Sequence, residues 1–98
     1  MKTVQLRRYE LLDGVMDEFV AWFPGIVEVR RQYGFTVEFA YADRAANQFV
    51  WAVSHDGDEA AFKAAEAVYS DSPERAARFA GQPQRVDAMH LAFVDPVG

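Results

Sequence analysis

Five side chains spread along the chain could together act on a small molecule. His90 is the one histidine expected within a regular element, and an imidazole can accept or release a proton near neutral pH. Arg7 and Tyr9 could donate hydrogen bonds to a carbonyl or enolate oxygen. Trp51 could stack on an aromatic substrate, and Gln5 shares the alternation of Arg7 and Tyr9. These residues predict a catalytic His90 and a substrate-binding set formed by Gln5, Arg7, Tyr9 and Trp51.

Each of these residues also has a structural interpretation. His90 needs a pocket and an oriented partner before it does more than pack. Trp51 could fill a core or a dimer interface, since tryptophan is common in both. Arg7 could form a cross-strand ion pair with Glu38 instead of binding a substrate. The residue types alone leave both interpretations open.

Metal, haem and nucleotide sites have little support in the sequence. The cluster His55, Asp56, Asp58 and Glu59 offers possible ligands, but its spacing fits a turn and a helix cap better. Neither long helix predicted below carries a histidine that could bind a haem iron. The six glycines are scattered and form no phosphate-binding loop. We therefore expect no metal and no cofactor.

Composition excludes several other classes of protein. The chain has 98 residues, of which 51% are hydrophobic and 26% charged, so we expect a single domain over residues 1–98. The net charge of −5 disfavours nucleic-acid binding, which depends on clustered basic residues. Without cysteine, disulfides and thiolate chemistry are excluded. The most apolar stretch, residues 19–27, is too short to span a bilayer, and residues 1–5 lack the apolar core of a secretory signal. We expect a cytoplasmic protein without a transmembrane segment.

Strands are predicted wherever apolar and polar residues alternate. Four segments show this alternation, and a turn rich in polar residues joins the middle two into a hairpin. The predicted strands cover residues 2–10, 35–41, 49–54 and 86–94.

Helices are predicted where apolar residues recur every three or four positions. The first begins after Gly14 and ends at Gly34, and Pro24 inside it should kink it or divide it in two. Asp58 is placed to cap a second helix, and Pro73 to open a short third one. The order βαββαβ predicts an α+β, ferredoxin-like fold, in which helices cover one face of a four-stranded antiparallel sheet.

Large apolar residues occur on both faces of these strands, so one layer of helices cannot cover them all. A second copy of the chain is expected to cover the other face, which predicts a homodimer. If Val4 and Leu6 face the helices, then Gln5, Arg7 and Tyr9 face away from them.

Trp51 and His90 are assigned to that same face, although a register shift of one residue would invert the whole assignment. For the second strand the pattern does not choose between Phe39 with Tyr41 and Glu38 as the inward-facing residues.

Four short segments carry a family resemblance: Tyr9-Glu10, Gln32-Tyr33-Gly34-Phe35, Asn47-Gln48-Phe49-Val50-Trp51 and Tyr69-Ser70-Asp71-Ser72-Pro73-Glu74. In this order and spacing the chain resembles the NIPSNAP family, within the dimeric α/β-barrel superfamily of ferredoxin-like proteins. Arg75 departs from the pattern, because many members have an aromatic residue there.

The resemblance implies a homodimer in which two sheets form a barrel, with helices outside and a pocket on the inner face of each sheet for a small apolar or aromatic molecule. The superfamily includes cofactor-independent monooxygenases, isomerases and proteins without an assigned reaction, so the fold alone does not decide the function. The expected function is the binding of that molecule by a NIPSNAP-like protein of unassigned activity, and whether the molecule is turned over is open. If the protein is an enzyme, we expect a cofactor-independent monooxygenase or isomerase in which His90 moves a proton and Arg7 or Tyr9 stabilises the oxyanion. The alternative is a non-catalytic dimeric binding or interaction protein.

Overall fold

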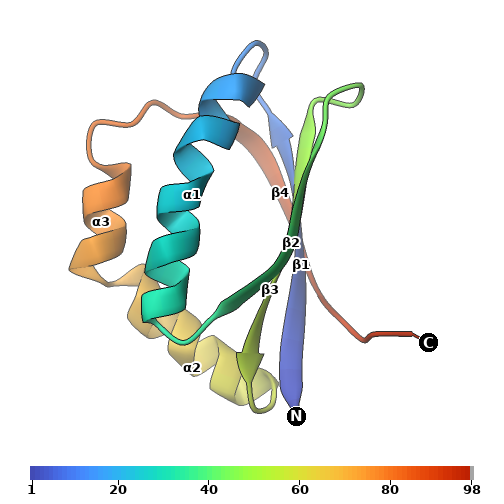
Figure 1. The fold of residues 1–98 in the computed structure, drawn as a ribbon, viewed down its shortest axis with the longest axis vertical. Helices are drawn as coiled ribbons and strands as arrows, with labels where there is room; N and C mark the ends of the chain where they lie inside the picture. The colour runs from blue at the N-terminus through green and yellow to red at the C-terminus, as the bar shows by residue number, and fades with distance from the viewer. Residues whose placement is uncertain (98) are drawn as a thin grey trace.

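A computed structural model describes residues 1–97. All three helices lie on one side of a single sheet, and the C-terminal segment leaves toward the other side (Figure 1). None of the helices in this part of the chain has the length and apolar character needed to span a membrane. In chain order the elements are β1 (Lys2–Leu11), α1 (Met16–Gln32), β2 (Thr36–Asp43), β3 (Gln48–Asp56), α2 (Glu59–Ser70), α3 (Pro73–Phe79) and β4 (Val86–Val94).

The sheet confirms the predicted fold. Its strand order is β2-β3-β1-β4 and every neighbouring pair is antiparallel, which is the ferredoxin-like arrangement. The bounds of β4 agree with the prediction, whereas β3 extends through His55 to Asp56. His55 was expected in a turn, so His90 is not the one histidine in a regular element.

Helix α1 continues through Pro24 as one element, so of the two predicted alternatives, a kink or a division, the division into two segments is wrong. Proline removes one backbone donor and crowds the preceding turn, but most of the stability of a helix comes from packing its apolar face. Phe19, Phe23 and Ile26 are all buried on that face, on both sides of the proline. Gly34, with φ +86°, follows the helix in the left-handed conformation that glycine tolerates best.

The two later helices begin as predicted. Asp58 accepts a hydrogen bond from the backbone N–H of Ala61 at 2.9 Å and so caps α2. Pro73 occupies the first turn of α3. This short helix lies against α1 because Gly25 leaves room for the Arg78 guanidinium, 3.0 Å from where a Cβ would stand.

The assignment of faces in β1 was wrong. Gln5, Arg7 and Tyr9 are buried on the helix side of the sheet, whereas Val4 and Leu6 lie on the side that the helices leave open. The condition on which the prediction rests, that Val4 and Leu6 face the helices, does not hold. Instead, polar and aromatic side chains of β1 form hydrogen bonds with one another beneath the helices. Because successive side chains of a strand point to opposite faces, an error of one residue in the assignment moves every side chain to the other face.

A β-bulge explains why the pattern of β2 did not decide its faces. Val37 pairs with Val53, but Phe39 pairs with Ala52, so one extra residue lies between them. Glu38, the extra residue, accepts a hydrogen bond from the Ser54 hydroxyl at 3.1 Å. The sequence left open whether Glu38 or the pair Phe39 and Tyr41 faces inward. Because of the bulge, all three side chains lie on the open side of the sheet.

Phe62 joins α2 to the sheet and tests this packing. Its side chain is 1% exposed and meets the Phe93 ring edge-on at 5.2 Å. Replacing Phe62 by Ala should lower the free energy of unfolding by about 3–5 kcal/mol, because it leaves a cavity beneath the helix. Urea denaturation measures the loss. Val68→Ala, on the exposed side of the same helix, should change it by less than about 0.5 kcal/mol, and equal effects would contradict the packing described.

Candidate functional site

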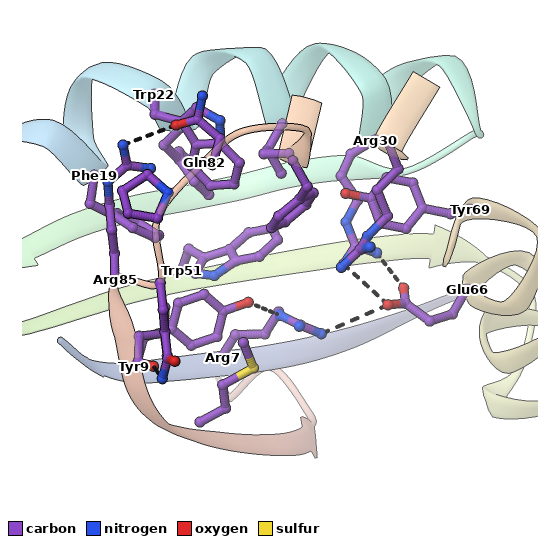
Figure 2. A pocket seen from close by; sticks show the side chains of 18 residues that line it. Arg7, Tyr9, Phe19, Trp22, Arg30, Trp51, Glu66, Tyr69, Gln82 and Arg85 are labelled. Carbon is purple, nitrogen blue, oxygen red and sulfur yellow. Dashed lines mark hydrogen bonds and ion pairs between the residues drawn. The ribbon is translucent and has the colours of Figure 1, made fainter. Parts of the chain in front are cut away.

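A cavity of about 400 Å³ lies between the sheet and the helices. All three helices and strands β1, β3 and β4 contribute to its lining, together with the connector before β4 (Figure 2). Its apolar wall is mostly aromatic, which suits a small ligand that must leave water. The aromatic lining residues are Tyr9, Phe19, Trp22, Phe23, Trp51, Tyr69 and Phe79.

The strand register places Arg7 and Trp51 directly opposite each other in the cavity floor. The Arg7 guanidinium lies 5.2 Å from the Trp51 ring centre, within the range of a cation–π contact. Its Nε donates a hydrogen bond to the Tyr9 hydroxyl at 2.8 Å, and its Nη1 donates to Gln5 Oε1 at 2.7 Å. These contacts hold the guanidinium in one orientation toward the cavity.

A second arginine, Arg30, approaches from the end of α1. It is 2% exposed, and its guanidinium lies 4.0 Å from the Tyr69 ring centre and 4.9 Å from that of Phe35. Both terminal nitrogens donate to the Glu66 carboxylate of α2, in a forked ion pair whose Nη2–Oε1 distance is 3.2 Å. Arg7 Nη1 lies 4.0 Å from the same Glu66 carboxylate. One carboxylate therefore serves two arginines.

Two buried donors in the lining have no hydrogen-bond partner among residues 1–97. They are the Nε of Arg30 and the Nε1 of Trp51. An unpaired donor without access to water costs about 1–3 kcal/mol, so it marks a position where an acceptor would be favourable. By contrast, Trp22 Nε1 donates to the carbonyl of Arg78 at 3.0 Å.

Four of the five predicted site residues come together here. Gln5, Arg7, Tyr9 and Trp51 form one bonded group, but on the helix side of the sheet and not on the face that we had assigned. The alternative ion pair of Arg7 with Glu38 is wrong, because Arg7 lies on the helix side of the sheet and Glu38 lies on the open side, where it pairs with Lys2.

His90 is separate from this group. It pairs with Arg8, on the opposite face of the sheet, and its Nε2 lies 2.6 Å from Glu10 Oε2. The hydrogen bond with His90 lowers the pKa of Glu10. The catalytic role of His90 stays a prediction, but the cavity does not include this residue.

Sequence reasoning missed Arg30, Glu66 and Tyr69. A signal was present, since Arg30 follows Phe23 and Ile26 at helical spacing and so lies on the buried face of α1. Glu66 likewise lies between Phe62 and Tyr69 on the buried face of α2. A charged residue on an apolar stripe, with an opposite charge on the stripe of another helix, predicts a buried pair.

The possible metal ligands at residues 55–59 have other roles. Asp58 is the helix cap described above, and His55 Nδ1 lies 2.8 Å from the carbonyl of Asp56. Within residues 1–97 no group of three or more histidine, aspartate or glutamate side chains is arranged to hold a metal ion.

Comparison with known proteins confirms the fold. An uncharacterized NIPSNAP domain protein from Burkholderia xenovorans superposes with a TM-score of 0.83 at 18% identity, over 99% of this chain and 95% of the other. A NIPSNAP family protein of unknown function from Agrobacterium tumefaciens gives 0.85 at 10% identity, over 97% and 87%.

A protein from Bacteroides thetaiotaomicron, named after the antibiotic biosynthesis monooxygenases, gives a TM-score of 0.73 at 19% identity, over 98% of this chain and 90% of the other. No protein-family model and no curated protein sequence matches the chain. The resemblance noted in the sequence is thus confirmed as a shared fold with NIPSNAP domain proteins and related monooxygenase-like proteins.

The ionisation of Tyr69 tests the environment of the cavity. Burial raises the pKa of its hydroxyl above the ordinary value of 10.0, although Arg30 and Arg75 act in the opposite direction. The folded protein therefore holds this proton more tightly than the unfolded chain, and the resulting stability is lost as the pH rises from about 10 through the higher folded-state pKa.

Thermal unfolding between about pH 8 and about pH 11 measures this effect. In Tyr69→Phe the alkaline loss of stability should be shallower than in the unaltered protein. An identical slope for the variant and the unaltered protein would contradict the burial of the Tyr69 hydroxyl.

Proposed function

We propose that the protein is a homodimer that binds a small aromatic or apolar molecule carrying an oxygen in the cavity between its sheet and its helices. The observation that supports this proposal most directly is that Trp51 Nε1 has no hydrogen-bond partner, although it lies in a largely aromatic cavity lining. Aromatic walls favour a planar ring, and the indole N–H together with the Arg7 guanidinium favours a carbonyl, phenolate or enolate oxygen.

The same geometry supports a reaction that passes through an oxyanion. Arg7 and Tyr9 lie side by side in the floor, and donors that are already oriented stabilise developing negative charge without reorganisation. Cofactor-independent oxygenation of an electron-rich phenol and isomerisation of a carbonyl compound both involve such a charge. The likeness to a protein named after monooxygenases is in keeping with this chemistry.

A binding protein without turnover is the second candidate, and one observation favours it. Among the described residues that line the cavity, Glu66 is the single carboxylate, and both of its oxygens are engaged by Arg30. A carboxylate whose two oxygens both accept hydrogen bonds from a buried arginine is not positioned to take a proton from a ligand. The cavity therefore supports ligand binding with or without turnover, and catalysis would in addition need a group that accepts a proton.

The homodimer is supported by the open face of the sheet. This face carries aliphatic and aromatic side chains from all four strands, with Tyr41 68% and Phe39 37% exposed. An apolar face of this kind is an aggregation hazard unless another surface covers it, and a second copy supplies a matching one. Its apolar residues include Val4, Leu6, Phe39, Tyr41, Val50, Ala92 and Val94.

Ligand binding can be followed by intrinsic fluorescence, because both tryptophans of the chain line the cavity. Naphthol should bind and change the emission. Trp51→Phe should weaken this binding about tenfold, because it keeps an aromatic wall and removes the free donor. Trp22→Phe should weaken it less, since the Trp22 donor is already used by Arg78. Equal affinities for both variants would contradict the role of the Trp51 N–H, and no binding at all would contradict the proposal.

The dimer is tested by placing a charge on the open face. Tyr41→Asp should shift the molar mass measured by light scattering from that of a dimer to that of a monomer, because an unpaired carboxylate would be buried in the interface. Val68→Asp is the matched control, since Val68 is 61% exposed on α2, away from this face. A monomeric unaltered protein, or a dimer that tolerates both changes, would contradict the proposed interface.

A further inference from the structure

We propose that the ligand of this cavity is an aromatic carboxylate, and that its carboxylate binds Arg7 and Arg30 in place of Glu66. This inference rests on the proposed function and names the class of molecule that the cavity accepts. In the free protein the Glu66 carboxylate occupies the site of the ligand carboxylate, and it therefore competes with the ligand for the two arginines.

The charge of the cavity is opposite to that of the protein. The cavity lining contains one acidic residue, Glu66, and four basic residues, whereas the whole chain carries a net charge of −5. The basic residues are Arg7, Arg30, Arg75 and Arg85. Positive groups inside a partly apolar cleft attract an anion more strongly than the same groups would in water. A neutral aromatic molecule would leave this excess unused.

The two guanidiniums nearest the centre converge on one point. Figure 2 shows the contacts from Arg7 and Arg30 meeting at the Glu66 carboxylate. A planar guanidinium matches the two oxygens of a carboxylate, so a carboxylate of a ligand can replace that of Glu66 with the same geometry. The unpartnered Nε of Arg30 offers a further donor that Glu66 does not use.

The three charged groups differ in their freedom to move. The side chains of Arg30 and Arg7 are 3% and 10% exposed, whereas that of Glu66 is 27% exposed. Arg30 is enclosed by aromatic rings, and Arg7 is held by Gln5 and Tyr9. Glu66 can therefore exchange its partners for water at low cost, while the arginines would have to be buried without a counter-charge if nothing replaced it.

The remaining lining limits the rest of the ligand. Aromatic rings surround the space next to the arginines, and Trp51 lies within reach of both guanidiniums, 5.2 Å from Arg7 and 5.4 Å from Arg30. An arene directly attached to its carboxylate would stack beside Trp51 while its acid group meets the arginines. A cavity of about 400 Å³ has room for one or two rings.

A matched pair of probes tests the inference: a naphthalene carboxylate and the corresponding naphthalene carboxamide, which have the same ring and nearly the same shape. Titration calorimetry should show the acid binding at least about tenfold more tightly than the amide. Glu66→Gln should tighten the acid about tenfold further and leave the amide unchanged, because the competing carboxylate is gone. Glu59→Gln removes the same charge from the exposed start of α2 and should change neither affinity.

The melting temperature of the Glu66→Gln variant, measured with and without each probe, tests the exchange with Glu66 independently of the affinities. Glu66→Gln leaves Arg30 without its partner, so the free variant should melt at a lower temperature than the unaltered protein, and the acid should restore more of this loss than the amide. Arg7→Gln should abolish the preference for the acid.

The outcomes separate the two proposals. Equal binding of acid and amide, both weakened by Trp51→Phe, would overturn the carboxylate inference and leave the aromatic cavity intact. An unchanged acid affinity in Glu66→Gln would overturn the exchange with Glu66. Failure of both probes to bind would overturn the small-molecule cavity and the carboxylate inference with it.

Discussion

The structure depends on the burial of one cation, the guanidinium of Arg30. A charge so removed from water is tolerated only when it is paired and surrounded by favourable contacts. Glu66 supplies the pair from α2, and the rings of Tyr69 and Phe35 supply the surroundings. The end of α1, the middle of α2 and the helix side of the sheet must therefore meet at a fixed separation. Arg30 and Glu66 both line the cavity, so the ion pair that joins the two helices forms part of its wall.

The two faces of the sheet have consequently become different kinds of surface. The helix side holds a polar group based on Arg7, with Gln5, Tyr9 and the Trp51 ring around it. The open side holds the short aliphatic residues that an ordinary core would contain. A ferredoxin-like sheet normally keeps its hydrophobic residues beneath its helices. Strand β1 reverses this arrangement, and the proposed ligand site and the proposed dimer interface both depend on that reversal.

Sequence patterns were sufficient for the elements and their topology, because alternation, helical spacing and capping residues act locally. They also selected Gln5, Arg7, Tyr9 and Trp51 as one group, since these residues share a parity that the register preserves. The face of that group could not be deduced, because the choice assumed that aliphatic residues pack beneath the helices. Arg30 and Glu66 were missed because local spacing only assigns each residue to the apolar stripe of its own helix. The pair becomes apparent when the two stripes are considered together, and the two residues are 36 positions apart.

The extra residue in β2 has a consequence for evolutionary change in this fold. Phe39 and Tyr41 reach the open face only because the bulge at Glu38 offsets them by one position against β3. If Glu38 paired regularly with β3 instead, the same two rings would point toward the helices, and Ala40 and Ala42 would take their places on the open face. A relative that lacks this residue altogether would keep both rings on the open face, because Phe39 would follow Val37 directly and could still pair with Ala52. The edge strand can therefore lose one codon at this position and still present the same aromatic surface, while the other three strands keep their pairing.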